Sequence, residues 1–513
     1  MRDKSSHFHL YLQDEWLAYD IRELVRLFID LEQVDVHIDA GIHKDSPVAK
    51  PGLVCDYGAD DGSGRSWLRL NDQTIEVAHH PQWQHHPQYK RHAKRKFLKG
   101  VYYLMQDWKP TKLPWGTLTG VRPVKLAHQL LRRFREDDFV RQTLREEYAL
   151  EEDKARLVTE IAHRQQPLLQ SVKDKSVSLY IGIPLCPSRC SYCSFISQAV
   201  SGRDDPLIAA YLEALLIELK GALAWLQQGQ WHLDTLYIGG GTPSVLSAEQ
   251  ISELMKTLSL NWPLETLREI TFEAGRPDTI TAEKLKVLKQ YPVNRISINP
   301  QTMQPETLTR INRCHTVEEF YQAWQLATDL GFETINLDLI VGLPGEGEEQ
   351  LRHTLAAIEP LKPANVTIHA LALKRSSTLK TDTMKHQVSD TEAAEMMNRI
   401  YAFAQTQGLV PYYLYRQKEM AGHLENVGFS KPGREGLYNI LMMEEKQTIM
   451  GIGAGAVSKL YFPETDRIER KPNVKNIQIY IDRMKQQGFD KTGWNQAFSL
   501  EKQHGKMNDN QEE

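Results

Sequence analysis

The stretch Tyr180-Ile-Gly-Ile-Pro-Leu-Cys-Pro-Ser-Arg-Cys-Ser-Tyr-Cys-Ser-Phe195 places three cysteines, Cys186, Cys190 and Cys193, within eight residues. The whole chain contains only five cysteines, and this C-x3-C-x2-C spacing is its strongest chemical signal. Thiolates on one loop can each bind a different iron of a small cluster, and four-iron clusters normally take four thiolate ligands. Three thiolates leave one iron without a protein ligand, and metal chemistry takes place at such an open position.

Other roles fit these cysteines less well. A structural zinc site needs a fourth cysteine or histidine in a paired arrangement, whereas Cys55 and Cys314 stand apart in the sequence. Disulfides are uncommon in a long chain with five cysteines and no secretory segment. Free cysteines often pack as small apolar residues, but these three lie among polar and proline residues. An iron–sulfur cluster is therefore the favoured interpretation, with zinc as the alternative.

The composition is that of a globular protein with two or three domains. The chain has 513 residues, of which 41% are hydrophobic and 25% charged, and its net charge of -4 does not indicate a nucleic-acid partner. The basic run Lys90–Lys99 fits a solvated helix face better than a phosphate-binding surface. No apolar run approaches the roughly 18 residues of a membrane span, and the N-terminus does not resemble a signal peptide. We expect a cytoplasmic protein with no membrane or nucleic-acid partner.

Four regions are expected. Residues 1–170 form an N-terminal α+β extension, residues 171–380 a barrel, residues 381–500 a C-terminal, mainly helical region, and residues 501–513 a disordered tail. The extension shows strand patterns and one amphipathic helix, and the C-terminal region shows one helix and one strand. In the extension the strands are His7–Leu12, Val34–Ile38, Trp67–Leu70 and Thr74–Val77, and the helix is Ile21–Leu31. In the C-terminal region the helix is Glu392–Gln405 and the strand is Tyr412–Tyr415.

Six short apolar strands alternate with helices between residues 175 and 370. The strands are Val177–Ile183, Thr235–Ile238, Glu269–Phe272, Arg295–Ile298, Ile335–Ile340 and Asn365–Ile368. The helices are Leu207–Leu226, Ala248–Leu258, Ala282–Lys289, Val317–Leu330 and Glu349–Ile358. This alternation predicts a parallel sheet with right-handed crossovers. Six strands are too few for an eight-fold barrel, so we expect an α/β fold with a partial (β/α)6 barrel.

Polar residues follow most of these strands. The second strand leads into Gly239-Gly-Gly-Thr-Pro-Ser244, whose glycines are expected to approach a ligand closely and expose N–H groups. Glu273 follows the third strand, Gln301 and Arg313 follow the fourth, and Asp338 lies on the fifth. Because the carboxyl ends of parallel strands share one edge, these side chains predict a polar ligand held beside the metal.

Residues 175–460 resemble the radical S-adenosylmethionine (SAM) enzymes of the oxygen-independent coproporphyrinogen III dehydrogenase (oxidase) family. The cysteine spacing, with Tyr192 before the last cysteine, resembles that of the superfamily. Gly-Gly-Gly-Thr-Pro and Asp338-Leu-Ile-Val-Gly-Leu-Pro narrow the likeness to this family, and residues 1–170 resemble an extension carried by one branch. The resemblance implies a [4Fe–4S] cluster and SAM as cofactors.

The resemblance also implies a set of site residues. Cys186, Cys190 and Cys193 would hold the cluster, and SAM would chelate the open iron through its amino and carboxylate groups. The positions that match contacts to SAM, or to a second SAM, are Tyr180, Tyr192, Gly240, Gly241, Thr242, Glu273, Gln301, Arg313 and Asp338, with Ala372 and Val457 by a looser alignment.

The chemistry implied by the resemblance begins with one electron passing from the reduced cluster to SAM. The resulting 5′-deoxyadenosyl radical takes hydrogen from the β-carbon of a propionate side chain of coproporphyrinogen III. Loss of an electron and of CO2 leaves a vinyl group, and two rounds give protoporphyrinogen IX. The implied partners are this tetrapyrrole and an electron donor such as flavodoxin or ferredoxin.

A haem chaperone of the same family is the alternative. The dehydrogenase has a further cysteine where this chain has Phe195, and the family has a histidine where this chain has Gly182. The chaperones carry His-Asn-x-x-Tyr-Trp, whereas this chain has Tyr438-Asn-Ile-Leu-Met-Met443. Met442, Met443 and His423 are candidate haem ligands in that interpretation. The missing chaperone motif and the N-terminal extension favour the dehydrogenase.

Overall fold

The computed structural model describes residues 7–13, 15–29, 34–56, 65–78, 89–111, 113–120, 122–195, 197–202, 204–371, 388–417 and 424–498. Ala372, His423 and the expected disordered tail lie outside these residues. The chain divides into two compact units, Met1–Ala162 and His163–Glu513, each described by itself here. The division at residues 170, 380 and 500 expected from the sequence stays a prediction.

The first unit contains a five-stranded sheet in the order β2-β1-β3-β4-β5. Its strands are β1 (Phe8–Leu12), β2 (Val34–Ile38), β3 (Gly52–Asp56), β4 (Arg65–Leu70) and β5 (Gln73–Ala78). Phe8, Leu10 and Leu12 are fully buried, as the alternating pattern of β1 predicts. The four expected strands are present, and β3 is an additional one. The helices are α1 (Ala18–Val25), α2 (Tyr89–Trp108), α3 (Pro123–Phe134), α4 (Asp137–Tyr148) and α5 (Glu152–Gln170), of which α5 continues into the second unit.

The second unit is built on an eleven-stranded sheet in the order β14-β15-β13-β12-β11-β10-β9-β6-β16-β17-β18. Six consecutive members of this order run parallel and are the six predicted strands. They are β6 (Ser176–Ile183), β9 (His232–Gly240), β10 (Glu269–Gly275), β11 (Arg295–Ile298), β12 (Ile335–Val341) and β13 (Asn365–Ala370). The predicted partial barrel is confirmed.

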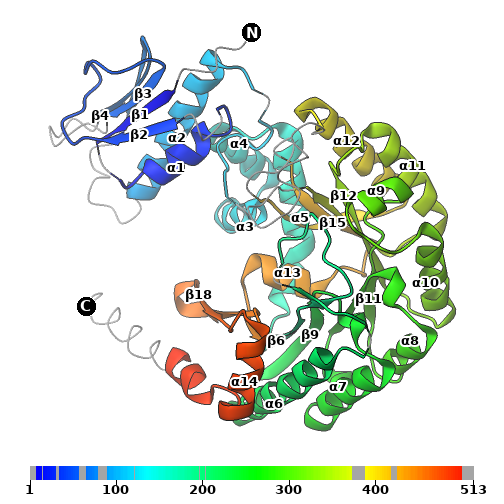
Figure 1. Cartoon of the computed structure of the whole chain (residues 1–513). Coiled ribbons are helices and arrows are strands. Elements are labelled where there is room, and N and C mark those ends of the chain that lie inside the picture. Colours follow the sequence, from blue (N-terminus) through cyan, green and yellow to red (C-terminus); the bar gives the residue numbers. More distant parts are fainter. Residues whose placement is uncertain are drawn as a thin grey trace. The chain divides into compact units, whose positions relative to one another are not determined.

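The predicted helices cover the outside of this parallel block (Figure 1). They are α6 (Pro206–Gln228), α7 (Ala248–Asn261), α8 (Ala282–Lys289), α10 (Val317–Asp329) and α11 (Glu348–Ile358). Helix α6 begins with Pro206 after Asp205, whose side chain accepts a hydrogen bond from the Leu207 amide. None of the helices in the described part of the chain combines the length and the apolarity that crossing a membrane requires.

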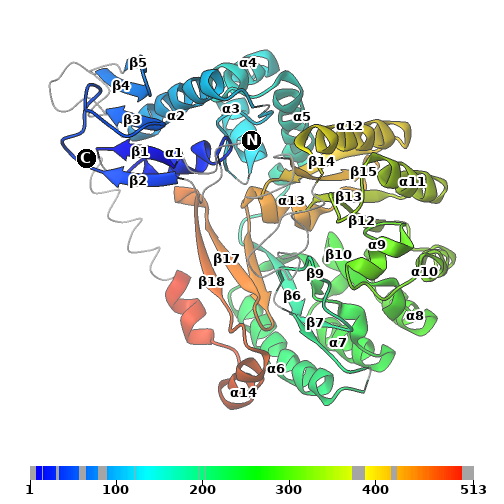
Figure 2. The same cartoon turned by 45° about the horizontal axis from the view of Figure 1, so that its top comes forward.

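The C-terminal region adds five strands to the sheet, one of which contains the predicted strand Tyr412–Tyr415, and three helices, one of which contains the predicted helix Glu392–Gln405. Strand β16 (Thr448–Ile452) pairs parallel with β6, and β17 (Val457–Phe462) and β18 (Arg467–Pro472) continue that edge (Figure 2). At the other edge, β15 (Asn426–Ser430) pairs antiparallel with β13 and carries β14 (Val410–Tyr415). The helices are α12 (Asp390–Thr406), α13 (Leu437–Glu444) and α14 (Ile477–Gln487). The region therefore widens the sheet at both edges of the parallel block.

Candidate functional site

A cavity of about 210 Å³ opens at the carboxyl ends of the parallel strands. Cys186, Cys190 and Cys193 line it together with all the other predicted site residues except Tyr180 and the more loosely aligned Ala372 and Val457. The residues brought together are Tyr192, Gly240, Gly241, Thr242, Glu273, Gln301, Arg313 and Asp338. The parallel topology explains this meeting, because residues far apart in sequence end their strands at the same edge of the sheet.

The cysteine loop is closed on itself by a short pair of strands. Strand β7 (Leu185–Cys186) pairs with β8 (Gln198–Ala199), and the Val200 amide donates to the Cys186 carbonyl over 2.9 Å. Within the loop the Cys193 amide donates to the Cys190 carbonyl over 3.1 Å. These backbone bonds hold the loop that brings all three cysteines to the cavity.

Arg276 ties this loop to the barrel. Its Nη1 donates to Oγ of Ser188 over 2.7 Å, and its other guanidinium nitrogens form an ion pair with Asp278 at 2.8 and 3.0 Å. Only 3% of its side chain is exposed, so the bidentate pair is shielded from water. The sequence analysis missed Arg276, although it directly follows the third barrel strand, where polar residues were expected.

The glycine-rich segment has a different role from the expected one. The amides of Gly241 and Thr242 donate to the carbonyls of Ile183 and Leu185, both over 2.8 Å, and are therefore not free for a ligand. A Cβ atom on Gly241 would lie 2.7 Å from the Leu185 oxygen and 2.9 Å from the Cys186 sulfur. Glycine is required here because the segment packs directly against the cysteine loop.

The three thiols meet the requirement of a cluster better than that of a single ion. Among the described residues, no three His, Cys, Asp or Glu side chains are placed to bind one metal ion. A four-iron cluster binds each thiolate through a different iron, so its ligands do not converge on one point. Cys314 is exposed and does not line the cavity. The donor set is therefore three thiolates, which fits a [4Fe–4S] cluster with one open iron.

Two carboxyl groups of the cavity have opposite shifts in pKa. Burial and, to a smaller extent, the charge of Asp338 raise the pKa of Glu273 to about 8, against the opposing effect of the Gly240 amide, which donates to Glu273 over 3.2 Å. Burial also acts to raise the pKa of Asp338, but hydrogen bonding and the charges of His369 and Arg313 lower it below its usual value. At neutral pH Asp338 is ionised and Glu273 is largely protonated.

Gln301 and Arg313 are held by backbone contacts. Gln301 has a φ of 68°, a left-handed conformation that is uncommon outside glycine, and its amide donates to the Asp338 carbonyl over 3.0 Å. Arg313 donates to the Asn299 carbonyl over 2.5 Å and to Oη of Tyr192 over 3.3 Å. Its Nη1 also lies 3.8 Å from the Cys190 sulfur, and its buried Nε has no hydrogen-bond partner among the described residues. Arg313 thus carries an uncompensated donor beside the cysteines.

Tyr180 does not line the cavity but lies beside Gly240, which does. A Cβ atom on Gly240 would lie 3.2 Å from its hydroxyl oxygen, and its ring stacks on those of Tyr237 and Tyr438 at centroid distances of 6.1 and 6.3 Å. Tyr237 and Tyr438 stack on each other at 4.6 Å. Tyr438, at the position of the chaperone histidine, is therefore buried in this stack.

Two of the candidate haem ligands, Met442 and Met443, lie in the described part of the chain, away from the lining of the cavity. Met443 packs against the buried cluster of Tyr412, Tyr413 and Ile440, and neither Met442 nor Met443 lines the cavity. His423 and the looser SAM contact Ala372 lie outside the described residues, and Val457 is 38% exposed on β17 without lining the cavity.

A group of lining residues that the sequence analysis did not select comes from β13, β14, β15 and the residues that follow. They are His369, Ala370, Leu371, Tyr415, Gln417 and Asn426. His369 could have been selected from the sequence, because it is a polar residue that directly follows the predicted strand Asn365–Ile368. Nothing in the sequence showed that β14 and β15 pair beside β13, so Tyr415 and Asn426 carried no signal.

Comparison with known proteins finds similarity over the part of the chain that contains the three cysteines. A model of the radical SAM superfamily matches residues 180–358. The oxygen-independent coproporphyrinogen-III oxidase-like protein HemZ of Bacillus subtilis (strain 168) is 44% identical over 374 residues, which span 72% of this chain and 74% of that protein. This chain is a radical SAM protein of the coproporphyrinogen III oxidase-like family. Proteins of the superfamily use a [4Fe–4S] cluster and SAM, and this radical SAM protein takes both cofactors.

Two further relatives show the range of this radical SAM family. The heme chaperone HemW of Bacillus subtilis (strain 168) is 32% identical over 316 residues, covering 61% of this chain and 77% of that protein. The solved structure of coproporphyrinogen III oxidase (HemN) from Escherichia coli is 23% identical, with a TM-score of 0.49, and covers 64% of this chain and 73% of that chain. A relative named as oxidase-like and a relative named as a chaperone are thus both similar to this radical SAM protein.

Proposed function

We propose that this chain catalyses the oxidative decarboxylation of two propionate side chains of coproporphyrinogen III to vinyl groups in the cytoplasm, giving protoporphyrinogen IX. The observation that carries the proposal is that the three thiols open into the same cavity as cationic and hydrogen-bonding side chains, among them Arg313 and His369. Such side chains suit a substrate that carries carboxylates. The 44% identity to a coproporphyrinogen-III oxidase-like protein supports the same substrate class.

The residues of the chain have separate tasks in this proposal. Cys186, Cys190 and Cys193 hold the cluster, and the glycine at position 241 lets the barrel approach the cysteine loop closely. Bound together, the cluster and SAM supply a one-electron cleavage of SAM that starts hydrogen abstraction. Glu273 and Asp338 offer oxygen atoms to amino and hydroxyl groups of SAM, and the buried Arg313 offers its unpartnered Nε–H. A reduced flavodoxin- or ferredoxin-type protein is the proposed electron donor.

A haem chaperone is the second candidate, favoured by the 32% identity to HemW. Two observations support the enzyme over it. Tyr438 replaces the chaperone histidine and is buried in a stack of three tyrosines, and Met443 packs against an apolar cluster and does not line the cavity. A protein that delivers haem needs an accessible ligand at its site.

Anaerobic turnover with reduced cluster, SAM and coproporphyrinogen III distinguishes the two functions. The enzyme is expected to release 5′-deoxyadenosine and CO2 in equal amounts, with formation of protoporphyrinogen IX. Tight haem binding together with SAM cleavage that does not depend on the tetrapyrrole would support the chaperone and contradict the proposal.

A further inference from the structure

One wall of the cavity carries none of the predicted cofactor contacts found among the described residues. It is formed by His369 on β13, Tyr415 on β14 and Asn426 on β15. Asn426 is committed to the sheet, because its Oδ1 accepts the Ala370 amide over 2.9 Å. The other two polar side chains, those of His369 and Tyr415, contact each other, and His369 also contacts Asp338.

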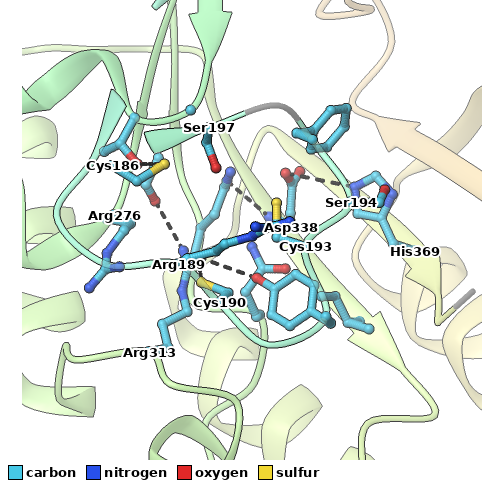
Figure 3. A pocket seen from close by; sticks show the side chains of 18 of the residues that line it. Cys186, Arg189, Cys190, Cys193, Ser194, Ser197, Arg276, Arg313, Asp338 and His369 are labelled. Atoms are coloured by element: carbon cyan, nitrogen blue, oxygen red, sulfur yellow. Dashed lines mark hydrogen bonds and ion pairs between the residues drawn. The ribbon is translucent and has the colours of Figure 1, made fainter. Parts of the chain in front are cut away.

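Asp338, His369 and Tyr415 form a chain of polar contacts across three strands. The Tyr415 hydroxyl lies 3.2 Å from Nδ1 of His369, within hydrogen-bond distance. Nε2 of the same ring lies 3.7 Å from Oδ2 of Asp338, an ion-pair distance, and Figure 3 shows the ring facing this carboxylate. Asn336 donates to the other oxygen, Oδ1, over 2.8 Å and so fixes the carboxylate. The Asp338 end of the chain is anchored, and the Tyr415 end lines the cavity.

The charge of the carboxylate at one end of this chain is countered within the cavity, so it does not exclude an anionic ligand. Asp338 is ionised, and its Oδ2 faces Nε2 of His369 at 3.7 Å. Arg313 and Arg276 line the same cavity, and Arg276 is neutralised by Asp278. The charge of Asp338 is therefore balanced by Arg313.

We propose that Nδ1–H of His369 and the hydroxyl of Tyr415 together bind one carboxylate of the tetrapyrrole substrate. This inference rests on the proposed function and assigns a substrate anchor to the same cavity. Two donors 3.2 Å apart match the two oxygens of one carboxylate, and hydrogen bonds to an ionised acceptor are the strong ones. The hydrogen bond between Tyr415 and His369 is replaced by one bond from each residue to the ligand. Asp338 positions the imidazole from its other side.

Two carboxylates enter this cavity in the proposed reaction, one from the substrate and one from SAM. We assign the pair to the substrate because the predicted SAM contacts that line the cavity come from the cysteine loop, from β9, β10 and β12 and from the loops that follow barrel strands, whereas Tyr415 lies on a strand added by the C-terminal region. If the pair binds the substrate carboxylate, Tyr415→Phe and His369→Gln weaken the binding of coproporphyrinogen III. If it binds the carboxylate of SAM, the same variants weaken the binding of SAM.

The test uses the full chain with its reconstituted cluster under anaerobic conditions. Both variants are expected to raise KM for coproporphyrinogen III on the order of tenfold, the size expected for a lost bond to a charged group. Because the bond is made equally to substrate and transition state, kcat is expected to change little, and the affinity for SAM to stay as in the wild type. Iron content and thermal unfolding check that the variants are folded.

Matched control variants remove the same groups elsewhere. Tyr321→Phe deletes a hydroxyl that donates to the Ala357 carbonyl over 3.0 Å on the outer helices, and His353→Gln replaces an exposed ring beside Gln304. Both controls are expected to keep the wild-type KM for coproporphyrinogen III. Failure of the wild-type protein to bind coproporphyrinogen III would overturn both the proposed function and this anchor. Normal wild-type turnover with unchanged KM in the Tyr415 and His369 variants would overturn the anchor alone, as would a loss of SAM affinity in them.

Discussion

The Gly240 amide donates to Oε2 of Glu273 over 3.2 Å, and this bond joins the ends of β9 and β10 at the floor of the cavity. The bond favours the ionised carboxylate, yet burial and the nearby charge of Asp338 outweigh it. The Glu273 carboxyl group is consequently held in its protonated form at neutral pH until a cation or a donor from a ligand reaches it.

The first prediction concerns the pH dependence of stability. The pKa of Glu273 is about 8 in the folded protein, above its ordinary value of 4.5. Between these values the folded protein holds a proton that the unfolded chain has lost, so the free energy of unfolding falls as the pH rises. Glu273→Gln removes this contribution. Between about pH 5 and pH 8 the unfolding free energy of the variant is therefore expected to fall by less than that of the wild type, the difference being on the order of 1–4 kcal/mol. Denaturant unfolding of cofactor-free protein measures this, and equal slopes for both proteins would refute the assignment.

The second prediction concerns Gly241. Alanine there brings a Cβ atom to 2.7 Å from the Leu185 oxygen and 2.9 Å from the Cys186 sulfur, so the cysteine loop must move. We expect Gly241→Ala to destabilise the protein by about 1–3 kcal/mol and to lower the iron and sulfide content after reconstitution. Gly120→Ala is the control, because among the described residues, its chain neighbours aside, none has an atom within 4 Å of the added Cβ. Full iron content in Gly241→Ala would show that the loop tolerates the displacement.

The third prediction separates the cysteines of the loop from Cys314. Cys190 is 9% exposed and lines the cavity, whereas Cys314 is exposed and lies outside it. Cys190→Ala is expected to abolish the broad brown absorption of the reconstituted protein, while Cys314→Ala retains it. The opposite pattern would mean that Cys314 is a cluster ligand.

The fourth prediction concerns the chaperone alternative. Met443 packs beside Tyr412, Tyr413 and Ile440, so its role here is in packing. Met443→Ala is expected to lower the free energy of unfolding by about 1–3 kcal/mol and to leave any haem affinity unchanged. Spectroscopic haem titration checks this, and a lost haem absorption band in the variant would identify Met443 as a ligand and favour the chaperone.

Much of the barrel could be predicted from the sequence because its signals are local. Each parallel strand is a short apolar run and each helix has its own periodicity, and α8 agrees in both bounds with the expected Ala282–Lys289. The cysteine spacing and the polar strand ends placed Glu273, Gln301 and Asp338 in one cavity without any knowledge of distances.

The rest depended on long-range pairing, which a single sequence does not show. Strand β16 joins β6 from more than 250 residues away, at Met450 and Leu179, and β14 reaches the barrel only through β15. Tyr415 therefore carried no local sign of its place in the cavity. The glycine-rich segment was recognised, but its use for packing against the cysteine loop follows from contacts that only the structure gives.

The central claim is that Cys186, Cys190 and Cys193 hold three irons of a [4Fe–4S] cluster and leave the fourth open for SAM. Mössbauer spectroscopy of the ⁵⁷Fe-reconstituted protein, recorded with and without SAM, tests this most directly. The account predicts a cubane spectrum in which one iron site differs from the other three and changes when SAM is added. A spectrum without a cubane, or a cubane whose four sites do not respond to SAM, would contradict it.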